Sequence, residues 1–334
     1  MKIIRPSYDI LYDTGDMFKN IERVARVCYK SEDKICEGSA EKMVRSLVKR
    51  HHEAMLEHHS LAFEIKHIED YIRFIEYAGF LRSRGGTCML RLTYTNRGLV
   101  SGNIRMWRDF ISSSLKLCDE LFADGVLINH DPLMPKIIAD LLSYKVKYPI
   151  IFDDLDMDIY KFDIKVFDDY EFIPVRYEDM FDEEKLYHMP LTIKFTVDRG
   201  VGNEIVRHRV ASFAQESTRY CNYSKGVFGT EITVIKPIFF DEGTDKYKLW
   251  EAGCMAAESA YLGLLNAGAT PQEARDVLPL SLKSELCMTA TIDEWKHFFN
   301  LRALDATGAA HPQMKEVTVP LLAELRKVYP SLFA

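Results

Sequence analysis

A mixed fold of helices and strands is predicted by the hydrophobic pattern of the sequence. Apolar residues recur with helical periodicity in segments 16–30, 40–51 and 246–267. Apolar and polar residues alternate, as in half-buried strands, in segments 60–66 and 191–197. Gly200 and Gly202 precede a predicted helix, but Ile205 occupies the third position of a dinucleotide-binding fingerprint and no second strand–helix–strand unit follows. The sequence therefore indicates a mixed α and β protein that is not of the Rossmann type.

The first half of the chain contains two clear helical stripes. They are formed by Ile21, Val24, Ala25 and Cys28 in the first helix and by Met43, Leu47 and Val48 in the second. After the strand at 60–66, we expect helices at 68–77 and 102–121 and a strand at 89–95.

In the second half, the strand 191–197 leads into a helix that starts near Val201. Segment 231–235 is a further strand, and the helix 246–267 ends at Gly268, a residue suited to a C-terminal cap. The residues of that helix expected to face inward are Leu249, Ala256, Ala260 and Leu264.

Cap residues predict the starts of the next two helices. Thr270 caps the first, with Pro271 at its first position, and Thr291 opens the second through a capping box with Glu294. Along the second helix, one face carries Trp295, Phe298, Phe299 and Arg302. This spacing places a guanidinium at the end of an aromatic stripe, where an ion-paired core residue is the ordinary interpretation.

Composition bounds the class of protein. The chain has 334 residues, 47% of them hydrophobic, and can bury one large core or two modest ones. Its first residues lack the apolar stretch of a signal peptide, and no apolar run is long enough to span a membrane. The seven cysteines are dispersed without a Cys-x-x-Cys pair, which is typical of reduced thiols. We expect a cytoplasmic protein with no membrane partner.

The net charge of −7 is concentrated in one segment. Residues 152–184 include 13 acidic and 3 basic side chains, so the rest of the chain is slightly positive. This distribution is compatible with a phosphate-rich small molecule, but it lacks the broad basic face of a nucleic-acid-binding protein. We expect small-molecule substrates and no nucleic-acid partner.

A cluster of cations at Arg207, His208 and Arg209 is the most specific signal in the sequence. Neighbouring side chains on a helix point in different directions, so these three fan out and can contact different parts of one large anion. Ser217 and Arg219 follow after seven intervening residues, and a hydroxyl with forked guanidinium groups is what phosphate recognition requires. A solvated basic turn is the alternative, but the surrounding residues are apolar, so we do not expect an open basic face.

Segment 51–59 carries four histidines and two glutamates, which suggests a metal site at first sight. His52 and Glu53 begin like a zinc-protease pattern, but Leu56 stands where that pattern needs its second histidine. We therefore expect no metal.

The complete motif, Arg-His-Arg, seven residues, Ser, one residue and Arg, resembles the signature of the flavin-dependent thymidylate synthases. Three further segments match the family in the same order, and they contain His52 to His58, Arg275-x-x-Leu278-Pro279 and Asn300-Leu301-Arg302. The resemblance covers roughly residues 20–66 and 188–330. It implies an α+β fold in which long helices surround a small, largely antiparallel sheet, with a large insertion at about 67–187.

The resemblance also implies a reaction, the reductive methylation of dUMP to dTMP with methylenetetrahydrofolate as carbon donor, NADPH as reductant and FAD as cofactor. The residues that match FAD contacts of the family are His52, Glu57, Arg207, His208, Arg209 and His297. Those that match or adjoin dUMP contacts are Glu204, Gln215, Ser217, Arg219, Arg275 and Arg302. Arg302 is the expected catalytic residue, because a cation at the uracil carbonyl stabilises charge that develops on the ring. The family forms homotetramers with shared active sites.

Several positions depart from the family pattern. Cys28 stands where many relatives have serine, and Ala54 replaces a hydroxyl residue, so these flavin contacts are expected to differ. Glu204 and Gln215 exchange an acid and an amide, and we expect the two side chains to face each other as a donor–acceptor pair; two separately solvated polar residues are the alternative. The insertion at 67–187 is expected to be accessory to the fold and to supply no residue to the flavin chemistry.

Two other classes of function fit the same cations. A regulatory protein could keep the nucleotide site without turnover, and a nucleic-acid-binding protein could use the helix that carries Arg207 to Arg209. Bound flavin would favour the enzyme, whereas salt-sensitive binding of duplex DNA would favour the last class.

Overall fold

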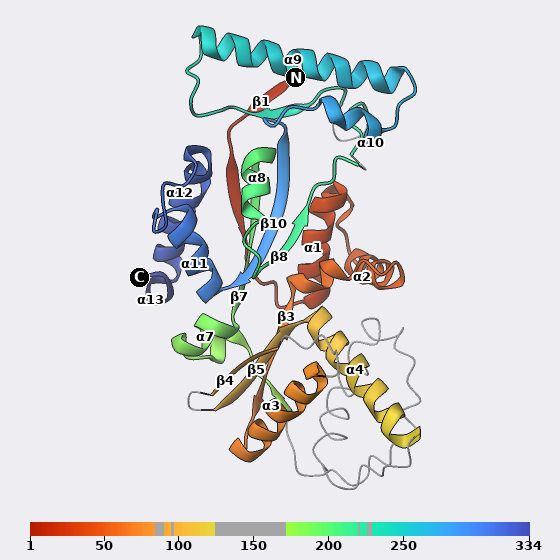
Figure 1. Ribbon diagram of the computed structural model, residues 1–334, viewed down its shortest axis with the longest axis vertical. Coiled ribbons are helices and arrows are strands. Elements are labelled where there is room, and N and C mark those ends of the chain that lie inside the picture. Colours follow the sequence, from red (N-terminus) through yellow and green to blue (C-terminus); the bar gives the residue numbers. More distant parts are fainter. Residues whose placement is uncertain (84–89, 95–96, 124–171, 220, 226–228) are drawn as a thin grey trace. The chain divides into compact units, whose positions relative to one another are not determined.

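The computed structural model divides into two compact units, each built of helices and a four-stranded sheet (Figure 1). The described residues are 1–83, 90–94, 97–123, 172–219, 221–225 and 229–334. The first unit contains Met1–Gly15, Glu22–Ile35 and Leu191–Ala334, and the second contains Asp16–Ile21 and Cys36–Pro190. The mixed fold expected from the sequence is confirmed at this level. The acid-rich stretch 152–171 lies outside the described residues.

The sheet of the first unit has the order β2-β7-β10-β8. Its strands are β2 (Ser7–Leu11), β7 (Pro190–Asp198), β10 (Lys283–Thr291) and β8 (Ser212–Gln215). The outer pairs, β2 with β7 and β8 with β10, are antiparallel. A separate parallel pair joins β1 (Lys2–Ile4) to β9 (Thr233–Ile235). The sequence predicted β7 and β9, but β1, β2, β8 and β10 were not predicted.

Helices accompany this sheet, and α9 (Asp245–Asn266) runs across the end of the unit that contains β1 (Figure 1). They are α1 (Met17–Tyr29, which begins in the second unit), α8 (Arg199–Ile205), α9 (Asp245–Asn266), α10 (Pro271–Ala274), α11 (Ile292–Arg302), α12 (Pro312–Val328) and α13 (Pro330–Phe333). α11 and α8 pack on β10, and α12 packs on β2. None of the described helices of the chain is long and apolar enough to cross a membrane.

The aromatic stripe of α11 forms the centre of this core, as its spacing predicted. Trp295, Phe298 and Phe299 are each at most 1% exposed. The rings of Trp295 and Phe298 lie 6.3 and 6.4 Å from Phe195 of β7, and the Trp295 indole N–H donates to the Leu191 carbonyl at 2.9 Å. One hydrogen bond therefore fixes the rotation of the helix that delivers Arg302.

The capping box expected at the start of α11 is wrong. The Thr291 hydroxyl contacts the carboxylate of Asp293 and does not accept the N–H of Glu294. The Glu294 carboxylate lies instead beside His208, a long-range contact that the local pattern could not reveal.

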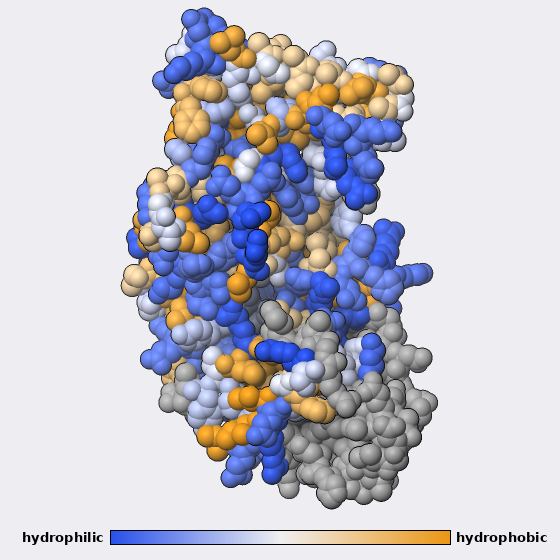
Figure 2. Space-filling model, in the orientation of Figure 1, coloured by the Kyte–Doolittle hydropathy of each residue, from blue (hydrophilic) through white to orange (hydrophobic). Residues whose placement is uncertain are grey.

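The inward face predicted for α9 is also wrong. Leu249 is 76% exposed, Leu264 is exposed, and the buried residues of the helix are Cys254 and Tyr261. Because α9 is apolar on several sides, periodicity alone could not select the buried one. Apolar residues consequently gather on the surface over α9, at the top of the view in Figure 2.

The second unit has a sheet of order β4-β5-β3-β6 in which all adjacent strands are antiparallel. Its strands are β3 (Ser60–Ile65), β4 (Arg91–Tyr94), β5 (Gly98–Asn103) and β6 (Phe172–Pro174). Its helices are α2 (Ser39–Lys49), α3 (Ile68–Ser83), α4 (Ile104–Ala123) and α7 (Asp182–His188), with a 3-10 segment at Glu53–His58. The expected helix at 102–121 begins at Ile104, because the preceding residues form β5 and the Asn103 side chain accepts the Met106 N–H at 2.9 Å.

An ion-pair cluster joins three elements of the second unit. Arg97, just before β5, donates to Glu64 of β3 at 2.8 Å and to Glu184 of α7 at 3.0 Å. The Glu184 side chain is fully buried and also accepts the Phe181 N–H at 3.0 Å. The paired guanidinium compensates the burial of this carboxylate.

Two glycines of the second unit provide a matched stability test. A Cβ at Gly98 would lie 2.6 Å from Cδ2 and 2.8 Å from Cγ of the buried Tyr71 ring, whereas a Cβ at Gly79, inside α3, meets nothing within 4 Å. We expect Gly98→Ala to destabilise the protein by about 1–3 kcal/mol through overpacking. Gly79→Ala should be neutral or stabilise by up to about 1 kcal/mol, because alanine favours a helix interior. Denaturant unfolding measures both, and equal effects would contradict the close packing at Gly98.

Candidate functional site

The cation motif lies just beyond the C-terminal end of α8 in the first unit. Asp198 caps the start of this helix by accepting the Val201 N–H at 2.8 Å. The helix ends at Ile205, and the Arg207 N–H then donates to the Glu204 carbonyl at 3.2 Å. The motif therefore occupies a turn in which successive side chains can leave in different directions.

The three motif side chains do diverge. His208 is buried, with its ring edge-on to Phe298 at 5.6 Å and beside His297 at 5.5 Å. Arg207 and Arg209, on either side of it, are exposed. The prediction that these side chains fan out is confirmed. The sequence also predicted that the cations do not lie on an open face, and this holds for His208 but not for Arg207 and Arg209.

His208 is a buried base with one nitrogen unsatisfied. In the described part of the chain, Nε2 has no hydrogen-bond partner and lies 3.5 Å from the Glu294 carboxylate. Burial, followed by the charges of His297 and Arg302, lowers the pKa of His208 to about 4. The ring is therefore neutral near pH 7, and Nε2 can serve a hydrogen bond from outside the protein chain.

Arg302 ends α11 and is joined to the end of α8. Its guanidinium donates to a carboxylate oxygen of Glu204 at 3.4 Å and to the Glu204 backbone carbonyl at 3.4 Å. The Thr318 hydroxyl donates to the Arg302 carbonyl at 2.7 Å, which fixes the backbone from the other side. The structure thus brings together two of the residues predicted for dUMP, with the guanidinium 26% exposed.

The expected pairing of Glu204 with Gln215 is wrong. Gln215 ends β8, and its amide donates to the Ser284 hydroxyl of β10 at 2.9 Å. Glu204 already has a partner in Arg302. Each side chain therefore has a hydrogen-bond partner other than the other one, and the exchange of acid and amide involves no mutual contact.

The loop after β8 positions Ser217 and Arg219. The Ser217 hydroxyl accepts the Arg219 N–H at 3.3 Å, and the Ser217 carbonyl accepts the Cys221 N–H at 3.0 Å, so the chain turns sharply here. The Arg219 guanidinium is directed towards α10, where Nε donates to the Gln272 side chain at 3.1 Å. Gln272 was missed by the sequence analysis, because only this long-range contact distinguishes it.

Arg275 follows α10 in a short 3-10 turn, Arg275–Val277. The predicted cap of α10 is confirmed, since Thr270 and Glu273 form a reciprocal capping box. Arg275 is exposed, with Asp276 at 4.0 Å. Gln272 lies three residues earlier, so α10 connects Arg219 and Arg275.

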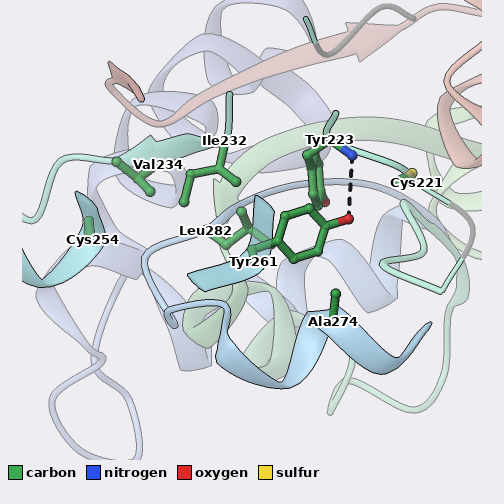
Figure 3. Close-up of a cluster of buried hydrophobic side chains, with 8 residues drawn as sticks. All are labelled: Cys221, Tyr223, Ile232, Val234, Cys254, Tyr261, Ala274 and Leu282. Atoms are coloured by element: carbon green, nitrogen blue, oxygen red, sulfur yellow. Dashed lines mark hydrogen bonds between the residues drawn. The ribbon is translucent and has the colours of Figure 1, made fainter. Parts of the chain in front are cut away.

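A buried apolar cluster packs against this loop and α10, and both contribute side chains to it (Figure 3). It contains Cys221, Tyr223, Ile232, Val234, Cys254, Tyr261, Ala274 and Leu282. The hydroxyl of Tyr261, from α9, accepts the Tyr223 N–H at 3.5 Å, drawn as the dashed line in Figure 3. The positions of Arg219 and Arg275 therefore depend on the same packed layer.

A buried charge cluster that the sequence analysis missed anchors the start of the loop. Glu216 is 2% exposed and accepts from Lys283 at 2.9 Å, from the Glu285 N–H at 3.3 Å and from the Tyr223 hydroxyl at 3.4 Å. Lys30 contacts Glu285 and lies 3.7 Å from Glu216. Although burial opposes it, the charges of Glu216 and Glu285 raise the pKa of Lys30. The cluster holds Ser217 by fixing the residue before it.

His52 and Glu57 belong to the second unit and are described with it. His52 is exposed and immediately precedes the 3-10 segment Glu53–His58. Glu57 accepts from Arg105 of α4 at 2.6 Å. These two candidates therefore lie in a different unit from the other predicted flavin contacts, Arg207 to Arg209 and His297.

Metal-ligating residue types do not converge among the described residues. No group of three or more His, Cys, Asp or Glu side chains there is arranged to hold a metal ion, including the histidines around residues 51–59. The arrangement instead offers exposed cations, a neutral buried imidazole and hydroxyl groups, which suits anionic ligands.

Comparison with known proteins identifies relatives of this chain. The family model described as thymidylate synthase complementing protein matches residues 9–72 and 180–331. It includes every predicted site residue and leaves out 73–179, which falls inside the insertion expected at 67–187.

Individual relatives match about two fifths of the chain. A flavin-dependent thymidylate synthase of Pyrococcus furiosus is 30% identical over 139 residues, covering 41% of this chain and 55% of the relative. One of Corynebacterium glutamicum is 30% identical over 152 residues, covering 41% and 57%. The chain thus spans a little over half the length of these curated relatives. A solved structure of the UMP/dUMP methylase PolB from Streptomyces cacaoi, bound with 5-Br dUMP, shares 15% identity with a TM-score of 0.40 and covers 100% of this chain and 95% of that one.

The buried state of His208 predicts a pH dependence of stability. Its pKa is about 4 in the folded chain and 6.5 ordinarily, so the unfolded chain binds more protons between these values. The stability that the neutral, buried His208 contributes to the folded chain is fully present above about pH 6.5 and is lost as the pH falls towards 4. We expect wild type to lose about 1–3 kcal/mol more than His208→Gln over this interval in denaturant unfolding. His67→Gln, at an exposed histidine, should behave like wild type, and equal pH profiles for all three proteins would contradict the burial of a neutral His208.

Proposed function

Because the chain belongs to the thymidylate synthase complementing protein family, as its motifs predicted, we propose that it is a flavin-dependent thymidylate synthase. The reaction is the reductive methylation of dUMP to dTMP, with methylenetetrahydrofolate as carbon donor and NADPH as reductant. The flavin dependence is supported by the names of the relatives that match the chain. The observation that carries the proposal is the turn after α8, where two exposed arginines flank a neutral, buried and unsatisfied histidine.

These residues fit the chemical groups of FAD. Arg207 and Arg209 are exposed forked cations suited to a diphosphate, and the unpartnered Nε2 of His208 can meet one polar atom of the cofactor. His297 lies beside His208 and extends the same surface. In the second unit, His52 and Glu57 are the proposed contacts. When bound, the flavin would supply the redox chemistry that no side chain can perform.

The dUMP contacts are proposed in the first unit. Arg219, Arg275 and the Ser217 hydroxyl would bind the phosphate, with Gln272 directing Arg219. Glu204 and Gln215 would border the nucleotide. The partly exposed guanidinium of Arg302 would donate to the uracil carbonyl and stabilise the charge that develops there during methylation. Glu204 orients this guanidinium through two contacts.

We further propose a cytoplasmic homotetramer with active sites shared between subunits, following the family resemblance. Free cysteines at positions 28, 36, 221, 254 and 287 support a reducing compartment.

Genetic complementation tests the proposed function. The gene should allow a thymidine-requiring strain without thymidylate synthase to grow on medium lacking thymidine, and the purified protein should carry flavin absorbance that is released on denaturation. Absence of growth with a folded, expressed protein would overturn the proposal. A flavin-free protein that binds dUMP would indicate a regulatory role, and salt-sensitive binding of duplex DNA would indicate a nucleic-acid-binding protein.

Arg302→Ala should strongly reduce turnover while leaving bound flavin. Removing a charge-assisted contact made mainly in the transition state costs about 2–4 kcal/mol, or roughly 30- to 1000-fold in rate. Steady-state kinetics and the flavin spectrum measure the two effects. Lys296→Ala, on the same helix, is the control. Near-normal turnover of Arg302→Ala would show that the residue only joins α11 to α8.

Cys221→Ala should keep activity within a few-fold of wild type, because Cys221 is unsuited to the role of attacking thiolate. It is 5% exposed, and burial, with the charge of Glu216, raises the pKa of its thiol to about 12. The thiolate is therefore scarce near pH 7. A dead variant with intact flavin would contradict this assignment.

A further inference from the structure

The helix α4 lies in the stretch 73–179 that the family model leaves out, yet it is built onto the segment that holds His52 and Glu57. Strands β3 and β5 pair with Ser60 opposite Asn103, so the chain enters β3 where it leaves β5. The Ile104 N–H donates to the His59 carbonyl at 3.0 Å, and the Trp107 indole donates to the Leu61 carbonyl at 3.3 Å. The first turn of α4 is therefore fixed beside residues 53–58.

Two arginines of α4 neutralise both carboxylates of this segment. Arg105 donates to Glu57 at 2.6 Å and lies 3.9 Å from Glu53. Arg108 contacts Glu53 at 3.3 Å and is 3% exposed, whereas the Arg105 side chain is 44% exposed. The Glu57 hydrogen bond raises the pKa of Arg105, so the guanidinium stays charged. Arg108 is thus an interior partner, and Arg105 is the cation that also meets solvent.

This arrangement has an electrostatic consequence for an anionic cofactor. Two uncompensated carboxylates would repel the diphosphate of a dinucleotide, and the paired guanidinium groups cancel that repulsion. A guanidinium has five N–H donors, so Arg105 can hold Glu57 in one orientation and still face the solvent with other donors.

We propose that Arg105 is a positioning residue for the flavin, which orients Glu57 so that the segment His52 to His58 can contact FAD. The inference rests on the proposed function. It replaces the expectation that the insertion supplies nothing to the flavin site, because part of the inserted chain becomes necessary for full cofactor affinity.

FAD titration of the full chain, after removal of bound flavin, tests the proposal. Arg105→Met should weaken FAD binding roughly three- to ten-fold, as expected for losing a half-exposed charge-assisted hydrogen bond. Arg105→Lys should recover part of the affinity, since it keeps the charge without the fork. Arg176→Met, which removes an exposed ion-paired arginine of the same unit, should bind FAD like wild type.

Two further measurements separate positioning from a purely structural role. The melting temperature of the flavin-free Arg105→Met variant should match wild type within a few degrees, and dUMP binding by calorimetry should be unchanged. In a Glu57→Gln background, Arg105→Met should add little further loss of FAD affinity, because the arginine acts through that carboxylate.

The outcomes are distinct. Wild-type affinity for FAD in Arg105→Met overturns the inference and leaves the proposed function intact. A loss of FAD affinity explained by a lowered melting temperature, or one that is additive with Glu57→Gln, also overturns it. Failure of the wild-type chain to bind FAD at all overturns the proposed function and this inference with it.

Discussion

Packing of α11 against β7 is the interaction on which the candidate site depends. The buried rings of Trp295 and Phe298 lie on Phe195, and the indole N–H is tied to the Leu191 carbonyl. The same helix presents His297, supports the ring of His208 through Phe298 and ends at Arg302. Apolar burial therefore sets the positions of the polar groups, and a shift of α11 would move a base, a cation and their partners together.

A second constraint acts through buried charge. Glu216 has almost no exposure and is surrounded by two lysines, a backbone N–H and a phenol. Such a cluster contributes little net stability when complete, but losing one member leaves an uncompensated charge in the interior. In this protein the cluster fixes the position of Glu216 and, through it, of Ser217, the next residue along the chain. The start of a loop that would bind phosphate is thereby fixed, and the buried side chains of Thr218 and Cys221 hold the loop further along.

The sequence predicted what depends on local pattern and missed what depends on distant partners. Aromatic spacing identified the buried face of α11, and the Thr270 cap was correct, because both follow from residues within two turns. The buried face predicted for α9 was wrong, since the pattern of a helix that is apolar on several sides does not indicate which side is buried. The site motif could be found by its fixed spacing, whereas Gln272 and Glu216 could not, because their roles come from contacts with residues far along the chain. Glu204 and Gln215 show the converse error, because the pattern suggested a mutual contact, whereas Glu204 pairs with Arg302 of α11 and Gln215 with Ser284 of β10.

The pairing of β3 has a consequence for any attempt to shorten the chain. Both strands that flank β3, namely β5 and β6, lie inside the stretch 73–179 that the family model does not contain. Excising that stretch would strip β3 of its hydrogen-bonded neighbours on both edges and uncover Phe63 and Ile65. The sheet of the second unit therefore depends on residues 73–179, and a chain shortened to the two ranges that the family model matches would leave β3 without a partner strand in that sheet.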